Sequence, residues 1–207
     1  MQVDMQRTDW VVVIPVKGTP EAKSRMDTIP GLPIAIALYT VEAALIAADV
    51  LVVTSASAAG SFEDLGARVV IDEGGGLNAA ASHGLAAAGS GNRAVLLGDL
   101  PALQAEELTD ALEAALRFPR AFVPDAEREG TVLITARAGA AHRPAFGPHS
   151  RAAHQESGYK ELDVDQQSGL RRDVDTQTHL REISSVRLGT RTRAILEENA
   201  LLGVQSS

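Results

Sequence analysis

Short β-branched segments alternate with longer helical stripes over the first 125 residues of this chain. Trp10–Val16 (WVVVIPV) is brief, rich in valine and followed by a turn region, which is typical of a buried strand. Apolar residues from Ile34 to Leu45 then recur at spacings of four, three and four, which indicates an amphipathic helix. Alternation of this kind predicts an α/β fold with a mostly parallel central sheet, flanked by helices on both faces.

The same two patterns recur further along the chain. They predict strands at Val50–Thr54, Ala67–Ile71, Ala94–Leu97, Arg120–Val123 and Thr131–Ala136. They predict helices over Leu77–Ala88, Leu108–Leu116, Asp175–Glu182 and Thr190–Ala200. The stretch from Arg137 to Tyr159 mixes Gly, Pro and His and shows no clear periodicity. No linker or repeat marks a boundary, and we expect one domain over residues 10–202 with flexible residues 1–9 and 203–207.

Composition excludes several classes of protein. The 207 residues are 45% hydrophobic and 22% charged, which is ordinary for a globular chain. Nineteen basic against 27 acidic residues give a formal net charge of −8, so we expect no broad nucleic-acid surface. Cysteine is absent, which excludes disulfides, thiolate metal sites and cysteine nucleophiles. No apolar run is long enough to span a membrane and no signal sequence is present, so we expect a cytoplasmic protein.

The loop after the first predicted strand gathers cations in an otherwise acidic chain. Lys17, Lys23 and Arg25 lie within nine residues of one another. Ligands of open α/β sheets bind outside the carboxyl ends of the strands, so these cations could neutralise a polyphosphate. The loop is not the GxxxxGK[ST] loop of P-loop enzymes, and a solvated basic turn explains the same pattern.

A glycine-rich turn follows the third predicted strand. Gly74, Gly75 and Gly76 allow close backbone approach, and the helix that follows offers free N–H groups to an anion or a base edge. Asn78 could cap that helix or donate a hydrogen bond to a nucleobase. The pattern leaves both uses open.

Aspartates at the ends of extended segments are candidate metal ligands. Asp99 follows the fourth predicted strand in the segment Gly98–Pro101, where it either binds a divalent metal or caps the next helix. Asp173 and Asp175 are two residues apart, so in an extended segment they point to opposite faces. Only one of them then meets the ligand, and Asp175 is a natural helix N-cap. Asp163 and Asp165 are also two residues apart, so spacing alone does not tell which of the two pairs binds a metal.

Histidine and serine patterns support no hydrolase. No HExxH or other metal-ligand spacing is present, and we expect all five histidines to be surface or core residues. No GxSxG elbow occurs, so acyl transfer has no support. The histidines are His83, His142, His149, His154 and His179.

Six segments occur together in the order of a known family. They are PVKGTPEAKSR, GGGLNAA, GDLPAL, the strand at Thr131, FGPHS at Phe146–Ser150 and RDVDT at Arg172–Thr176. The series resembles the 2-phospho-L-lactate / phosphoenolpyruvate guanylyltransferases (CofC/FbiD family) of coenzyme F(420) biosynthesis, from about Trp10 to about Leu188. The resemblance implies a single-domain fold of the nucleotide-diphospho-sugar transferase (Rossmann-like) type, similar to the molybdenum-cofactor guanylyltransferases.

The resemblance also implies roles for individual residues. It assigns catalytic roles to Lys17, Lys23, Asp99 and Asp173, and nucleotide binding to Lys17, Lys23, Arg25, Gly75, Gly76, Asn78 and Gly98. It assigns Mg²⁺ to Asp99, Asp173 and Asp175, and the phosphorylated three-carbon acid to Thr131, Gly147 and Ser150. Asp163 and Asp165 fall outside the matched motifs. One departure is Asp27–Pro33 (DTIPGLP), which replaces an Arg-containing stretch, so one expected cationic contact is missing or comes from elsewhere.

The implied reaction is attack by an acceptor phosphate on the α-phosphorus of GTP, with release of pyrophosphate. The matched segments look closer to the phosphoenolpyruvate branch of the family, which favours this acid as the acceptor. The sequence by itself does not decide between phosphoenolpyruvate and 2-phospho-L-lactate. A molybdopterin or sugar-phosphate nucleotidyltransferase of the same fold is one alternative. A non-catalytic nucleotide-binding module is another. The expected partners are GTP and the small acid, and the sequence leaves open whether the chain forms a homodimer.

Overall fold

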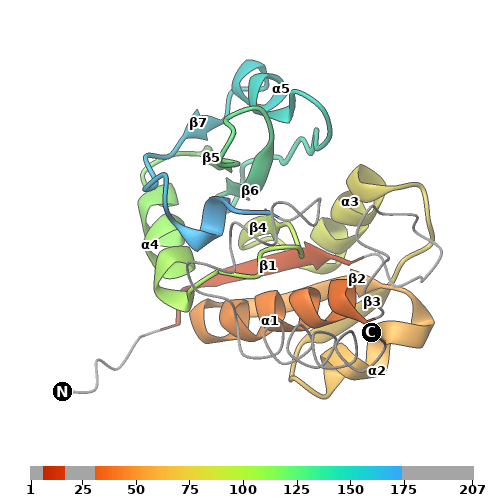
Figure 1. Cartoon of the computed structure of the whole chain (residues 1–207). Helices are drawn as coiled ribbons and strands as arrows, with labels where there is room; N and C mark the ends of the chain where they lie inside the picture. Colours follow the sequence, from red (N-terminus) through yellow and green to blue (C-terminus); the bar gives the residue numbers. More distant parts are fainter. Residues whose placement is uncertain (1–6, 17–30, 174–207) are drawn as a thin grey trace, which may run out of the picture.

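A seven-stranded sheet with the strand order β3-β2-β1-β4-β6-β5-β7 forms the centre of the molecule (Figure 1). The structure is a computed structural model, and it describes residues 7–16 and 31–173. The two helices expected at Asp175–Glu182 and Thr190–Ala200 lie outside the described residues. So do residues 1–6 and 203–207 of the expected flexible ends, and residues 27–30 of the DTIPGLP segment.

Six of the seven strands occur where the sequence predicts strands. The first four, β1 to β4, run parallel to one another, which confirms the prediction of a mostly parallel sheet. Strand β6 is antiparallel to both of its neighbours, β4 and β5. The short connection from β5 to β6 explains this direction, because two adjacent strands joined by a few residues can only form a hairpin. The strands are β1 (Trp10–Pro15), β2 (Asp49–Thr54), β3 (Arg68–Ile71), β4 (Asn92–Leu96), β5 (Arg120–Pro124), β6 (Thr131–Ala136) and β7 (Lys160–Glu161).

Helices cover both faces of the sheet. Helices α1 (Leu32–Ala47), α2 (Ala56–Glu63) and α4 (Ala105–Ala115) contribute to the hydrophobic cluster on one face, and α3 (Leu77–Ala87) contributes to the cluster on the other. Val12 and Val13 of β1 belong to different clusters, because successive side chains of a strand point to opposite faces. This explains the uninterrupted apolar run of the first strand. Among the described residues, no helix combines the length and the apolar character needed to cross a membrane.

Several short elements lack a signal in the sequence. Helix α5 (Ser150–Glu156) lies in the stretch without clear periodicity and was not predicted. It has only seven residues and buries two of them, Ser150 and His154, so it carries no apolar stripe. The short helix α2, the two-residue strand β7 and the 3₁₀ turn η1 (Gly169–Arg171) were also not predicted.

Helix α3 lies close to the sheet because Gly84 faces β1 and β2. A Cβ atom built on Gly84 would overlap the Val13 side chain and lie 2.7 Å from Cγ2 of Val53. The neighbouring helix residue Leu85 is buried as well. The position of α3, and with it the glycine-rich turn at its start, therefore depends on the absence of a side chain at residue 84.

We expect Gly84→Ala to lower the free energy of unfolding. Overpacking of a buried contact costs about 1–3 kcal/mol, which outweighs the gain of about 1 kcal/mol in helix propensity. Gly60→Ala in α2 is the matched control, because a Cβ there meets nothing within 4 Å. The control should be stabilised by about 0.5–1 kcal/mol. Urea denaturation of both variants measures the difference, and equal effects at the two positions would contradict close packing of α3.

Candidate active site

The carboxyl ends of the parallel strands and the start of β6 meet at one edge of the sheet (Figure 1). Leu96 of β4 pairs with Leu133 of β6, and the Leu97 N–H donates to the Val132 carbonyl at 2.9 Å. Continuing this antiparallel register places Thr131 level with Gly98. The structure therefore brings the segment predicted to bind nucleotide and metal beside a residue predicted to bind the acid.

Asp99 is held at this edge by the close approach of β4 and β1. A Cβ atom on Gly98 would lie 3.2 Å from Cγ2 of Val16 and 3.4 Å from the Pro15 carbonyl oxygen. Asp99 is half-buried, and its Oδ1 atom is shielded from solvent. The alternative that Asp99 caps the following helix is wrong, because α4 begins after Gln104. The Gln104 N–H donates to Glu107 Oε2 at 3.0 Å in a capping box.

The segment that leads to Asp173 contacts the loop that follows Asp99 and the first turn of α4. The Gly169 N–H donates to Glu107 Oε1 at 3.0 Å. A Cβ atom on Gly169 would overlap the Ala102 carbonyl group, so η1 packs directly on this loop. The two aspartates predicted to bind metal thus lie in segments that pack against each other. Asp173 comes two residues after η1 and is half-buried.

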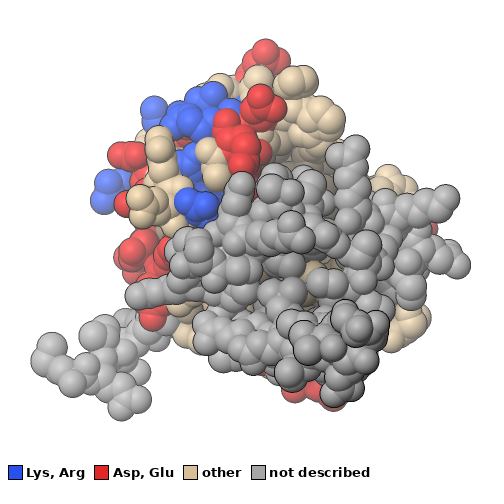
Figure 2. All heavy atoms as spheres, in the orientation of Figure 1, with Lys and Arg blue, Asp and Glu red and all other residues tan. Residues whose placement is uncertain are grey.

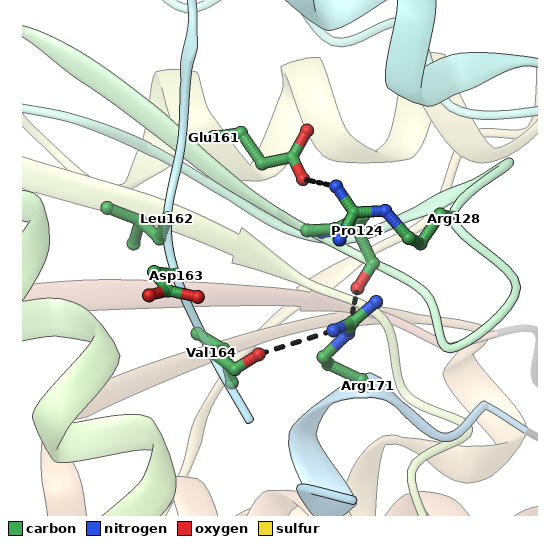
Figure 3. A pocket seen from close by; sticks show the side chains of 7 residues that line it. All are labelled: Pro124, Arg128, Glu161, Leu162, Asp163, Val164 and Arg171. Carbon is green, nitrogen blue, oxygen red and sulfur yellow. Dashed lines mark hydrogen bonds and ion pairs between the residues drawn. The ribbon is translucent and has the colours of Figure 1, made fainter. Parts of the chain in front are cut away.

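The buried Arg171 ties the same segment to the end of β5 (Figure 3). Its guanidinium donates to the carbonyl oxygens of Pro124 at 3.2 Å, Asp125 at 2.7 Å and Val164 at 3.2 Å. Burial lowers the pKa of Arg171 from its usual value. No sequence pattern predicts this role, because the three acceptors are backbone carbonyl groups of other segments.

A pocket of ≈ 180 Å³ lies beside Arg171, lined in part by Arg128, Glu161 and Asp163 (Figure 3). Arg128 and Arg151 both pair with Glu161, at 2.7 and 2.9 Å. Figure 2 shows basic and acidic side chains next to one another in this part of the molecule. The charges of Arg128 and Glu161 therefore balance each other, and the pocket includes none of the residues predicted to bind a substrate.

Asn78 joins the glycine-rich turn to the FGPHS segment. Its Nδ2 donates to the Phe146 carbonyl at 2.9 Å, and the Phe146 N–H donates to Asn78 Oδ1 at 2.8 Å. Helix α3 begins after Gly76 without a side-chain cap, so the capping alternative for Asn78 is wrong. Gly75 and Gly76 both have positive φ angles, 94° and 87°, which favour glycine. The side chain of Asn78 thus links two segments predicted to bind different substrates.

The buried His154 contacts one of the residues predicted to bind the acid and lies on the same helix as another. His154 Nδ1 lies 3.0 Å from Thr131 Oγ1, and the Ala145 N–H donates to Nε2 at 3.0 Å. Ser150 is buried at the start of α5, one turn before His154, and its N–H donates to the Gly147 carbonyl at 3.1 Å. Gly147 has a φ of 131°, which favours glycine. The structure therefore links Thr131 directly to His154, and it joins Gly147 to Ser150 at the start of the helix that carries His154.

His154 is a buried core histidine, which agrees with the expectation of a surface or core residue, but the sequence did not predict its contact with Thr131. Its spacing of four from Ser150 is the one signal that the sequence offered. Of the other residues predicted to act at the site, Lys17, Lys23, Arg25 and Asp175 lie outside the described residues. Within residues 7–16 and 31–173, no three histidine or acidic side chains are grouped as metal ligands.

Comparisons with known proteins find relatives that match most of this chain. The family model of the MobA-like NTP transferase domain matches residues 31–174. A phosphoenolpyruvate guanylyltransferase of Streptomyces coelicolor is 46% identical over 94% of this chain and 99% of its own length. One of Salinispora arenicola is 47% identical over 88% of this chain and 91% of its own. A cytidylyltransferase structure from Leptospira borgpetersenii shares the fold, with a TM-score of 0.60, 13% identity and coverage of 96% of each chain.

We expect Asn78→Asp to destabilise the protein. The carboxylate still accepts from the Phe146 N–H but no longer donates to the Phe146 carbonyl, which costs about 1–3 kcal/mol of unfolding free energy. Ser90→Ala, at an exposed position just beyond α3, is the control, with an expected change within about 0.5 kcal/mol. Urea denaturation measures both variants. An Asn78→Asp variant as stable as the control would show that the link to Phe146 contributes nothing.

The two histidines on this side of the sheet make stability depend on pH. Burial lowers the pKa of His142 and of His154 from 6.5 to about 4. Between these values the unfolded chain binds protons that the folded chain does not bind. We therefore expect the free energy of unfolding to fall as the pH is lowered from 6.5 toward 4. Urea denaturation at a series of pH values measures the slope, which should be shallower in His142→Gln. A stability that does not change over this range would contradict the prediction.

Proposed function

This chain belongs to the MobA-like NTP transferases and, among them, to the phosphoenolpyruvate guanylyltransferase family, and we propose that it transfers GMP from GTP to phosphoenolpyruvate. The products are pyrophosphate and enolpyruvyl-diphospho-guanosine, which we place in coenzyme F(420) biosynthesis. The observation that carries the proposal is identity of 46% over nearly the whole length of both chains. The names of the relatives favour phosphoenolpyruvate over 2-phospho-L-lactate as the acceptor.

The site supports a direct displacement at phosphorus. An oxygen of the acceptor phosphate attacks the α-phosphorus of GTP, a new P–O bond forms, and the bond to the β-phosphate oxygen breaks. The acceptor needs no strong general base, because the second pKa of a phosphomonoester is about 6. What the protein must supply is alignment of two anions. The register that sets Thr131 level with Gly98 supports this role, since it brings the acceptor segment to the nucleotide segment.

We assign the acceptor to Thr131, Gly147 and Ser150, and the nucleotide to Gly75, Gly76, Asn78 and Gly98. The anchored positions of these segments support the assignment. Lys17, Lys23 and Arg25, outside the described residues, are proposed to contact the triphosphate.

Asp99 and Asp173 are the proposed Mg²⁺ ligands, together with Asp175 from outside the described residues. The donor set fits the ion, because Mg²⁺ takes a few carboxylates and completes its coordination with water and phosphate oxygens. The packing of η1 on the loop after Asp99 supports the proposal that Asp99 and Asp173 bind the same ion. When bound, the ion would reduce the repulsion between the two anionic substrates.

We expect purified protein with radiolabelled GTP and phosphoenolpyruvate to form a guanylylated acid and pyrophosphate. Equal concentrations of phosphoenolpyruvate and 2-phospho-L-lactate in one reaction should yield mainly the enolpyruvyl product. Removal of Mg²⁺ by a chelator should abolish turnover, and adding Mg²⁺ back should restore it. Absence of a product with either acid would overturn the proposed reaction.

We expect Asp99→Asn to lower kcat/KM by about 100-fold or more while the protein stays folded, because it removes one proposed ligand charge. Asp163→Asn is the matched control, since this exposed aspartate lies outside the proposed site and should leave kcat/KM unchanged. Far-UV circular dichroism confirms folding of both variants. Equal activity of the two variants would remove Asp99 from the reaction.

A further inference from the structure

We propose that His154 is a positioning residue for the acceptor, which acts by turning the hydroxyl proton of Thr131 toward the acceptor anion. The inference rests on the proposed function, because it concerns the residues assigned to phosphoenolpyruvate. His154 touches neither substrate in this proposal. It acts through Thr131 and through the backbone at Ala145.

The tautomer of His154 follows from its two hydrogen bonds. The Ala145 N–H is a donor only, so Nε2, at 3.0 Å, must accept and carries no proton. A neutral imidazole has one protonated nitrogen, so the proton is on Nδ1. Nδ1 lies 3.0 Å from Thr131 Oγ1 and must therefore donate to it. The hydroxyl oxygen of Thr131 is thus an acceptor in this bond.

This arrangement leaves the hydroxyl proton of Thr131 available. Its oxygen accepts the hydrogen bond from the Nδ1–H of His154, so its own proton cannot be directed at the ring. The hydroxyl makes no other hydrogen bond within the described part of the chain. Thr131 is 3% exposed and lies level with Gly98 at the edge where the substrates are proposed to meet. An anionic acceptor is the partner that this donor fits.

The surroundings of His154 keep the ring neutral and fixed. The side chain is fully buried, and the rings of Phe146 and Tyr159 meet it edge-on at centroid distances of 5.4 and 5.3 Å. Burial lowers its pKa to about 4, so the neutral form prevails near pH 7. Of the charged groups nearby, Arg120 lies over the ring of Tyr159, with its Cζ atom 5.2 Å from the ring centroid. Neutral His142 also faces Tyr159.

Two amide variants separate the two hydrogen bonds of the ring. An asparagine amide reaches the place of Nδ1, so His154→Asn keeps a donor for Thr131 and loses the bond to Ala145. A glutamine amide reaches the place of Nε2, so His154→Gln keeps an acceptor for Ala145 and loses the donor. We expect KM for phosphoenolpyruvate to rise about tenfold in His154→Gln and less than about threefold in His154→Asn. KM for GTP should stay unchanged in both.

A double-mutant cycle tests whether His154 acts through Thr131. Thr131→Val removes the hydroxyl, so His154→Gln should change KM for phosphoenolpyruvate less than about twofold in that background. Additive effects in the double variant would overturn the proposal. So would a parallel rise of both KM values, or equal effects of the asparagine and glutamine variants, because each indicates a purely structural role.

The tautomer can be measured without any variant. Long-range ¹H–¹⁵N correlation spectra of the ¹⁵N-histidine-labelled protein at pH 7 should show His154 protonated at Nδ1 and bare at Nε2, and a proton on Nε2 would overturn the proposal. This measurement does not depend on activity. If wild-type protein forms no guanylylated product, the proposed reaction fails while the tautomer result still tests the geometry.

Discussion

The antiparallel pairing of β6 with β4 is the constraint on which the rest of the site depends. It reverses the direction of the sheet at a single strand, so that the first residue of β6 and the residues after β4 share one edge. In a fully parallel sheet Thr131 would lie at the opposite edge, far from Asp99. The hairpin between β5 and β6 enforces the reversal. A short loop therefore decides that the proposed acceptor and nucleotide segments are neighbours.

Interactions between segments far apart in the sequence then fix the loops at this edge. Asn78 and Phe146 exchange two hydrogen bonds across 68 residues. His154 connects Thr131 to Ala145, and Gly169 allows η1 to lie on the loop after Asp99. The contacts of Asn78 and His154 use buried or half-buried polar groups, so removing either partner destabilises the protein. The site is thus held by specific polar links on a hydrophobic sheet, which suits a reaction that depends on alignment.

The sequence predicted the elements with strong periodicity and missed those without it. The buried strands and the long helices were predicted because their apolar patterns report burial on one or both faces. Helix α5 was missed because it buries only Ser150 and His154, and β7 because two residues carry no pattern. For Asn78 and Asp99, the sequence left a capping role open. The structure rules it out, because the N-cap residues of the two helices are Gly76 and Gln104.

By itself, the sequence determined the order of strands and helices along the chain and the mostly parallel character of the sheet. It also determined which loops carry candidate site residues directly after a strand. It could do so because local pattern encodes backbone conformation and burial, and because strand ends of such sheets form ligand sites. Only the tertiary structure decided the partner of each polar side chain. The acceptor of Arg171, the donor to His154 and the partner of Asn78 are all backbone groups of other segments. Every residue carries such backbone groups, so no sequence pattern distinguishes the one that will be close in space.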